Sequence, residues 1–233
     1  MGLTASSGGR FFSTFRQREA MNLINAKYGN EPGLKAYTRV SDQFTPFASL
    51  TIPASVSEAR YILDGLLNSD VGRRTEEQYA DTDGFTDHVF AVTSILVHRF
   101  IKRIRALPSK QFYVFVPGTT PSHLKGMVGG KIREGLIASN RPEILRIAAT
   151  MPAGTIAPRQ ILRKLASNPR QNDLAVALRE VGRVERTLFM MDWALNTDMQ
   201  RRVQIGLNKG EAHHALKNAL RIGRQGEIRD RTV

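Results

Sequence analysis

The chain has 233 residues, of which 41% are hydrophobic and 24% charged, enough for one compact domain with a buried core. It has no cysteine, which excludes disulfides, thiolate zinc sites and cysteine nucleophiles and leaves oxygen and imidazole ligands for any metal. The 34 Lys and Arg residues outnumber the 21 Asp and Glu residues, and the net charge of +13 favours a polyanionic partner, with nucleic acid as the leading candidate.

The first residues, MGLTASSGG, carry neither a charged region nor an apolar run, and no apolar run in the chain approaches the ~20 residues that span a bilayer. We therefore expect no export and no membrane insertion, and we expect the chain to work in the cytoplasm. Residues 6–9 are small enough to suggest a phosphate-binding loop, but no Gly-Lys-Ser/Thr follows them, so they predict a flexible turn.

The first half of the chain mixes strand and helix patterns. Residues 33–40 and 48–53 are short runs between turn-like stretches and are predicted to be adjacent strands. Ser55 followed by Glu58 is typical of a capping box. Apolar residues then recur at helical spacing, which predicts a helix that ends at about Leu67.

A strand over residues 76–80 is predicted to end in an acidic turn that places Asp81 in a loop, and Thr86 should cap the helix that follows. The spacing of Asp81, Asp83 and Asp87 does not fit a calcium loop, which needs its glycine at position six and a glutamate at position twelve. Two interpretations stay open for this cluster: ordinary turn chemistry, or one aspartate that joins distant carboxylates around a divalent metal.

The second half of the chain is predicted to be mostly helical. Residues 100–105 alternate apolar and basic side chains and residues 112–116 are aromatic and β-branched, so the two segments could pair as a hairpin. Helical periodicity follows over about 121–199 and is strongest over 159–166 and 174–195. This stretch predicts a helical block inserted into the fold.

A final helix is predicted from about Lys209 to Arg221, with Glu211 near its positive amino-terminal end. His213 and His214 are sequence neighbours on this helix, so they point in different directions and do not form a zinc pair. Candidate phosphate contacts are basic residues in the predicted strand over 100–105, the helix over 174–195 and the final helix. For any one of these residues, a charged surface that simply faces solvent is an equally good interpretation. These candidates are Arg103, Arg105, Arg183 and Lys209.

Four long blocks stand out in the sequence: YADTDGFTDHVF (79–90), RPEILRIAATMPAGTIAPRQILRKLASNPRQN (141–172), ALREVGRVERTLFMMDW (177–193) and LNKGEAHHALKNAL (207–220). Together with NAKYG (25–29) and SDQFTPF (41–47), they resemble the catalytic region of the Tn-three family of replicative transposases. The resemblance covers nearly the whole chain. It begins just after Met1, so we expect the family's large amino-terminal DNA-recognition region to be missing.

This resemblance implies an α/β fold of the RNase H-like (DDE transposase and integrase) type, with a mixed sheet flanked by helices. It implies a single domain over residues 1–233, with a helical insertion over 118–205 that precedes the last catalytic helix. In this family an Asp, Asp, Glu triad performs the chemistry, and the second Asp and the Glu match Asp81 and Glu211. These carboxylates would share two Mg²⁺ ions, or Mn²⁺ as a substitute, during in-line attack on a phosphodiester.

The first Asp of the triad belongs to a family motif that reads Ser-Ser-Asp-Gly-Gln, followed soon by Phe. The matching residues here are Ser6, Ser7, Gly8, Gly9, Arg10 and Phe11, so Gly8 stands where the family has its Asp, unless the alignment shifts to Ser7. No acidic residue precedes Glu19. The resemblance therefore implies an incomplete triad and a two-metal site that lacks a ligand.

Two functional hypotheses follow from the resemblance. The first is a transposase catalytic domain that cleaves and joins double-stranded DNA at transposon ends and target sites through Asp81 and Glu211, impaired by Gly8. The second is a truncated, non-catalytic remnant that binds DNA or full-length transposase, or does nothing. The partners expected for the chain also include a second copy of itself, as a homodimer. A basic RNA-binding protein is a third interpretation, which preference for duplex DNA over structured RNA would count against.

Overall fold

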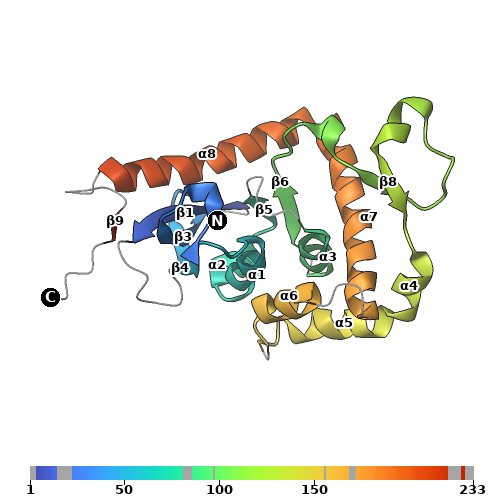
Figure 1. Cartoon of the computed structure of the whole chain (residues 1–233), viewed down its shortest axis with the longest axis horizontal. Helices are drawn as coiled ribbons and strands as arrows, with labels where there is room; N and C mark the ends of the chain where they lie inside the picture. The colour runs from blue at the N-terminus through green and yellow to red at the C-terminus, as the bar shows by residue number, and fades with distance from the viewer. Residues whose placement is uncertain are drawn as a thin grey trace.

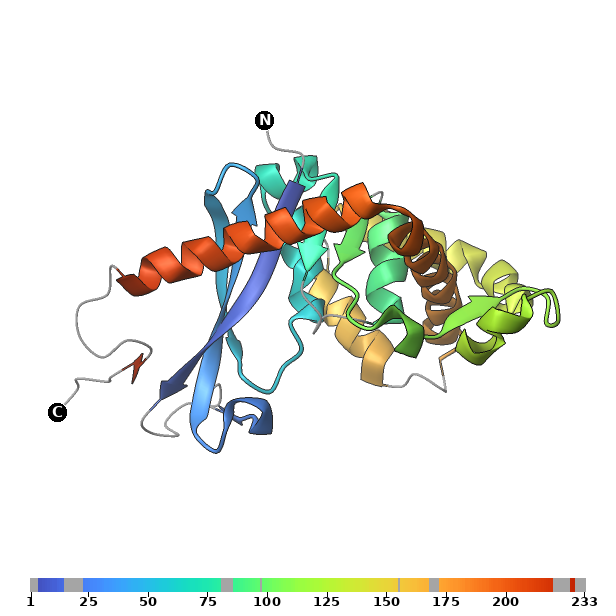
Figure 2. The same cartoon turned by 90° about the horizontal axis from the view of Figure 1, so that it is seen from above.

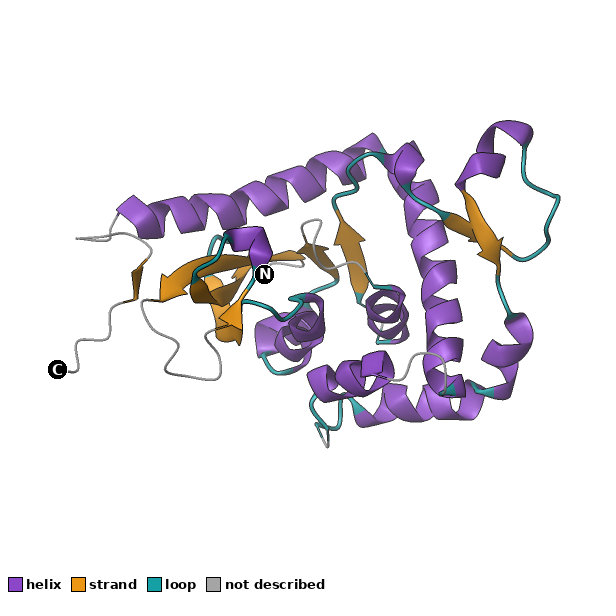
Figure 3. Ribbon diagram, viewed as in Figure 1, coloured by secondary structure: helices purple, strands orange, loops and turns teal. Residues whose placement is uncertain are grey.

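The computed structural model describes residues 4–14, 23–80, 86–96, 98–154, 156–167, 172–219 and 227–228. It is a mixed α/β structure in which helices cover a β-sheet on both sides (Figures 1 and 3). In the part of the chain that it describes, no helix is both long enough and apolar enough to cross a membrane.

The main sheet is built around the first strand, β1 (Thr4–Thr14). The other strands of this sheet are β2 (Leu23–Ile24), β3 (Pro32–Ser41), β4 (Pro46–Pro53), β5 (Glu77–Ala80), β6 (Arg99–Lys102) and β9 (Glu227–Ile228). Its core order is β4-β3-β1-β5-β6, with β3 antiparallel to β1 and β4, and β5 parallel to β1 and β6. This mixed sheet agrees with the RNase H-like fold that the resemblance implies.

The helices are α1 (Ala59–Leu67), α2 (Asp70–Arg74), α3 (Asp87–Ile95), α4 (Glu134–Ser139), α5 (Arg141–Thr150), α6 (Pro158–Ser167), α7 (Asp173–Leu195) and α8 (Thr197–Ala219). Short 3₁₀ turns are η1 (Ala26–Tyr28), η3 (Leu107–Ser109) and η4 (Ser122–Met127). Seen from above, α8 crosses β1 on one face of the sheet (Figure 2). Helices α1, α2 and α3 lie below the sheet in Figure 1, so the sheet separates α8 from α1.

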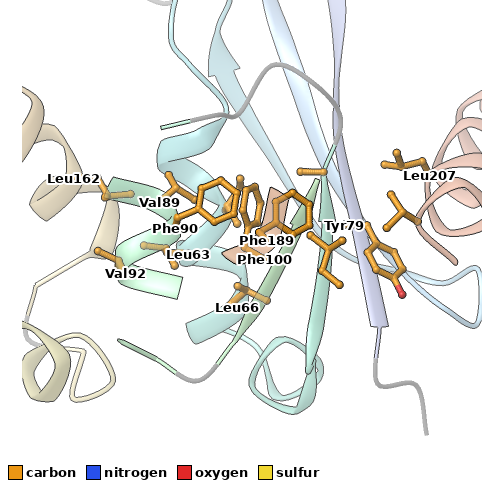
Figure 4. Close-up of a cluster of buried hydrophobic side chains, with 14 of the residues drawn as sticks. Leu63, Leu66, Tyr79, Val89, Phe90, Val92, Phe100, Leu162, Phe189 and Leu207 are labelled. Atoms are coloured by element: carbon orange, nitrogen blue, oxygen red, sulfur yellow. The ribbon is translucent and has the colours of Figure 1, made fainter. Parts of the chain in front are cut away.

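The main hydrophobic core joins the sheet to α1, α3 and α7 (Figure 4). The Phe90 ring packs against Phe100 with centroids 5.2 Å apart and against Phe189 at 5.6 Å. Trp193 continues this aromatic row, 5.9 Å from Phe189, and is a core residue. Burial of four aromatic side chains contributes several kcal/mol to holding α3 and α7 on the sheet, at roughly 1.5–3 kcal/mol each.

Helix α7 approaches α3 closely at Gly182. A Cβ atom at this position would overlap the carbonyl oxygen of Asp87, so the contact requires a residue without a side chain. Helix α8 packs against β5 in the same way, because a Cβ at Gly206 would overlap the ring of Tyr79. Both long helices therefore dock through glycine.

Several sequence predictions are confirmed by these elements. Adjacent strands are found at β3 and β4, a helix ends at Leu67, and Thr86 caps α3 by accepting a hydrogen bond from the main-chain N of Val89. The two strongest helical segments are α6 and α7. The short strand before Asp81 is β5.

Four predictions are wrong. Residues 6–9 belong to β1 and do not form a turn, because β3 and β5 pair with them on either side. Ser55 and Glu58 form no capping box, since Glu58 is itself the N-cap residue and pairs with Lys35 Nζ at 3.4 Å. The hairpin of 100–105 with 112–116 does not exist. The last helix begins at Thr197, twelve residues before the predicted start at Lys209.

The two segments of the expected hairpin belong to different sheets. Strand β6 pairs with β5 in the main sheet, whereas β7 (Phe112–Val114) pairs in parallel with β8 (Val128–Lys131). Strand β8 lies within residues 121–199, for which the sequence predicts helices with breaks near Pro142, over 152–158 and at Pro169 but no strand. The boundaries 118–205 of the insertion remain a proposal.

Candidate active site

Strand β1 presents alternate side chains to its two neighbouring helices, which decides what residues 6–9 can reach. A Cβ at Gly210 of α8 would lie 3.4 Å from the Oγ of Ser6, so Ser6 faces α8. A Cβ at Gly9 would overlap the carboxylate of Glu58, which adjoins α1. Because side chains alternate along a strand, position 8 shares the α8 face with Ser6, and Ser7 shares the α1 face with Gly9.

Ser7 is buried and its hydroxyl is occupied. Its Oγ accepts a hydrogen bond from the hydroxyl of Tyr37 at 2.7 Å and another from the amide Nε2 of Gln78 at 3.1 Å. Burial, the largest cause, raises the pKa of Tyr37 to about 12, so this phenol stays a neutral donor. Ser7 is thus part of the sheet's polar interior on the side away from α8.

Gly8 lies on the α8 face in an open space. A Cβ built here would meet no atom of the described residues within 4 Å, so a Cβ atom is accommodated without displacement of its neighbours. Gly8 pairs with Thr38 of β3, and the preceding residue Ser7 pairs with Ala80, the last residue of β5. Asp81 follows Ala80 directly in the sequence and lies outside the described residues. Position 8 is therefore next to the end of the strand that leads into Asp81.

Glu211 lies on α8 where this helix crosses β1. Leu207, Gly210 and Glu211 are spaced three and four residues apart, so they share one side of the helix. Leu207 is buried in the core and Gly210 approaches Ser6, which directs this side of α8 toward the sheet. Glu211 itself is exposed. The structure thus brings the regions of Gly8 and Glu211 together from opposite ends of the sequence.

The described residues do not fit a complete metal site. Among them no group of three His, Asp or Glu side chains is arranged to hold a metal ion. Gly8 offers no side-chain oxygen, although the space beside it would admit one. Carboxylate oxygens are the ligands that Mg²⁺ and Mn²⁺ prefer. Asp81 lies outside the described residues, so a missing ligand at position 8 remains a proposal.

The four candidate phosphate contacts have different surroundings. Lys209 donates from Nζ to the carbonyl oxygen of Asp42 at 2.8 Å and lies 5.0 Å from the ring of Phe44. Arg103 donates to Oε1 of Gln204 at 3.3 Å. Arg105 is exposed and has no hydrogen bond or ion pair to any residue that the structure describes. Its role, like that of the other three, remains a proposal.

The fourth candidate, Arg183, belongs to a partly buried charge network that the sequence did not reveal. Asp87 Oδ1 lies 2.6 Å from Nη1 of Arg186, and its Oδ2 lies 3.8 Å from Nε of Arg183. Glu180 is fully buried and accepts from Arg183 at 2.8 Å and from Arg133 at 3.0 Å. Burial raises the pKa of Asp87, and the neighbouring arginines oppose this shift. The only sequence cue was the spacing of Glu180 and Arg183 on one helix face.

These features define an RNase H-like α/β domain whose candidate site lies between the centre of β1, the end of β5 and α8. The family described as Tn3 transposase DDE domain matches residues 1–233. The transposase for transposon Tn501 of Pseudomonas aeruginosa is 46% identical over 231 residues, and that for transposon Tn21 of Escherichia coli is also 46% identical over 231 residues. The transposase for transposon gamma-delta of Escherichia coli (strain K12) is 31% identical over 208 residues.

The chain belongs to the Tn3 transposase DDE domain family. The matches to the Tn501 and Tn21 proteins cover 99% of this chain but 23% of each relative, and the match to the gamma-delta protein covers 89% of this chain and 21% of that relative. The chain thus corresponds to a small share of each of these transposases.

Proposed function

We propose that this chain is the catalytic domain of a replicative DNA transposase whose cleavage and joining chemistry is impaired because Gly8 replaces the first carboxylate. Asp81 and Glu211 are the proposed remaining catalytic carboxylates. Membership of a family of DDE domains supports the assignment to transposition. The observation that carries the impairment is the geometry of β1, where position 8, and not position 7, faces α8.

The geometry of β1 supports the proposal that the residue at position 8 decides whether the site is complete. A carboxylate at position 8 would extend into open space on the side of the sheet where α8 carries Glu211. A carboxylate at position 7 would instead replace a hydroxyl that is buried between Tyr37 and Gln78. The carboxylates of a catalytic site act as one unit, so removing one of them disables the others as well. We therefore expect loss of one carboxylate to reduce strand cleavage by orders of magnitude.

The proposed substrate is double-stranded DNA, at the terminal inverted repeats of a transposon and at its target. The net charge of +13 supports a polyanionic partner. We propose that the divalent ion used by a chain with all three carboxylates is Mg²⁺, with Mn²⁺ as a substitute. We also propose that the site of action is the bacterial cytoplasm at the nucleoid, as the bacterial sources of the relatives suggest.

Gly8 also favours a second function, that of a non-catalytic remnant. Such a chain would bind DNA, pair with a second copy, or bind a full-length transposase, without cleaving DNA itself. The two functions share the same fold and partners. They differ in the effect of adding a carboxylate at position 8. The first function predicts that this change restores DNA cleavage, and the second predicts that it does not.

The test is metal-dependent nicking of an end-labelled transposon-end duplex. The native chain is compared with Gly8→Asp and with Gly8→Asp carrying Glu211→Ala, which removes the proposed last carboxylate. We expect nicking by Gly8→Asp alone. Absence of nicking in all three proteins would favour the non-catalytic remnant, whereas nicking by the native chain would show that Gly8 is not the missing ligand position.

A further inference from the structure

The sequence contains a long stretch with only one sign of charge. Residues 88–133 hold eight Lys and Arg residues and no Asp or Glu. The end of this stretch, residues 110–133, forms β7, η4 and β8 and is called the β7–β8 arm below. Figures 1 and 2 show the arm at one end of the molecule, on the side of α7 away from the main sheet.

The arm is held firmly against α7. The main-chain N of Tyr113 donates to Oγ1 of Thr187 at 3.0 Å, and the Tyr113 ring lies 4.3 Å from the guanidinium carbon of Arg183. At the other end of the arm, Arg133 binds the buried carboxylate of Glu180 through Nε and Nη2. Because both ends are fixed, the charges between them are presented in a defined position.

Three lysines of the arm remain without an acidic partner. Lys110, Lys125 and Lys131 are exposed, and none of their side chains has a hydrogen bond or ion pair to any residue that the structure describes. Elsewhere on the surface, by contrast, Arg73, Arg146 and Arg201 pair with acidic residues on their own helices. Unneutralised positive charge at one end of the molecule is the feature that attracts a phosphate backbone.

Lys125 and Lys131 line the same hollow. This cavity has a volume of about 310 Å³ and is also lined by Thr120, Gly118 and Gly130. Both glycines have positive φ, +93° and +141°, and a Cβ at either would meet no atom within 4 Å. The hollow is therefore bordered by two lysines, a threonine and two glycines, and its volume admits a phosphate group.

We propose that the β7–β8 arm is a DNA-binding surface separate from the catalytic site, in which Lys125 and Lys131 hold a backbone phosphate of duplex DNA. The proposal rests on the proposed function, because it takes DNA as the partner. It adds a place on the molecule, on the far side of α7 from the sheet, where the duplex makes sequence-independent contact. Such contacts fix the position of the duplex and do not read its bases.

The first experiment compares two variants of equal net charge. Lys125→Ala/Lys131→Ala removes the cations of the hollow, and Arg163→Ala/Lys164→Ala removes two exposed cations from α6. Fluorescence anisotropy with a labelled duplex gives the affinity of each protein for DNA between about 50 and 300 mM KCl. Over this range, binding through phosphate contacts is expected to lose affinity by orders of magnitude. We expect the arm variant to bind more weakly than the α6 variant and its log–log salt slope to flatten by about 0.9 for each phosphate that the variant no longer neutralises.

The second experiment uses the absence of cysteine from the chain. Lys131→Cys and Lys164→Cys each introduce a unique thiol, one in the arm and one on α6. We expect duplex DNA to slow maleimide labelling of Lys131→Cys several-fold and to leave labelling of Lys164→Cys unchanged. At duplex concentrations that saturate the protein, protection reports contact at residue 131 directly, so a variant whose affinity is unchanged still reports contact.

The outcomes separate the two proposals. If the native chain binds the duplex and the arm variant matches the α6 variant with no protection at residue 131, the arm proposal is overturned and the proposed function stands. If the native chain does not bind duplex DNA at all, both are overturned. If Lys131→Cys is protected by phosphatidylserine vesicles and not by DNA, the arm is a lipid-binding surface and the DNA assignment is wrong.

Discussion

The hydroxyl of Tyr37 donates a 2.7 Å hydrogen bond to the Oγ of Ser7, in the interior of the sheet. This bond holds Ser7 on the α1 side of β1 and leaves position 8 on the α8 side. The assignment of Gly8 as the missing carboxylate position depends on this relationship. Burial of Tyr37 raises the pKa of its phenol to about 12, so the hydroxyl remains a neutral hydrogen-bond donor.

Alkaline pH should weaken the fold through Tyr37. Its folded-state pKa is raised by burial, so its contribution to stability is complete below the unfolded value of 10.0 and is lost as pH rises through about 12. The loss should be on the order of 2 kcal/mol. Denaturant unfolding between pH 9 and pH 12, followed beside phenolate absorbance, measures it. Tyr37→Phe should lose less stability over this range, and ionisation of Tyr37 near pH 10 in the folded chain would contradict the assignment.

Gly182→Ala should destabilise the packing of α7 on α3. The added Cβ would overlap the carbonyl oxygen of Asp87, so the helices must separate, at a cost of roughly 1–3 kcal/mol or more. Gly135→Ala on α4 is the control, since its Cβ would meet nothing within 4 Å and alanine favours a helix. Thermal unfolding should show a lower Tm for the first variant and an equal or higher Tm for the second. Equal Tm values for Gly182→Ala and the native chain would contradict the close docking.

Asp64→Ala should detach α6 from α1. The Asp64 carboxylate is buried and accepts from the main-chain N of Arg159 at 3.1 Å and from its Nη1 at 2.8 Å, so it both caps α6 and forms an ion pair. Removing it leaves a helix-end donor and a cation unpaired, which should cost about 2–4 kcal/mol in urea unfolding. Asp70→Ala, which breaks an exposed pair with Arg73, is the control and should unfold like the native chain. A similar midpoint for both variants would show that Asp64 is not an anchor.

Periodicity predicted the helices well because their apolar positions are set locally. Helices α6 and α7 were predicted within a few residues, and their buried faces follow the repeat that the sequence displays. Strand β1 was missed because its Ser-Ser-Gly-Gly run has low strand preference, and the segment is extended only because β3 and β5 pair with it. The hairpin failed for a related reason, since β6 pairs with β5 and not with its neighbour in sequence.

The candidate site, like the fold, was predicted from the sequence only in part. Family motifs indicated Gly8, Asp81 and Glu211, and the alternation of side chains on β1 adds independent support for position 8 over position 7, because position 8 faces α8. The network of Glu180 with Arg133 could not be predicted, because its members lie 47 residues apart and meet only through the docking of α4 on α7. Asp81 is outside the described residues, so its placement rests on the resemblance.

The most direct measurement is cleavage of a transposon-end duplex by Gly8→Asp compared with Ser7→Asp, in Mg²⁺ and in Mn²⁺. Both variants add one carboxylate to β1, at neighbouring positions that face opposite sides of the sheet. We predict metal-dependent cleavage by Gly8→Asp, no cleavage by Ser7→Asp, and a lower Tm for Ser7→Asp because its charge would be buried beside Tyr37. Cleavage by Ser7→Asp and not by Gly8→Asp would contradict the placement of the missing carboxylate.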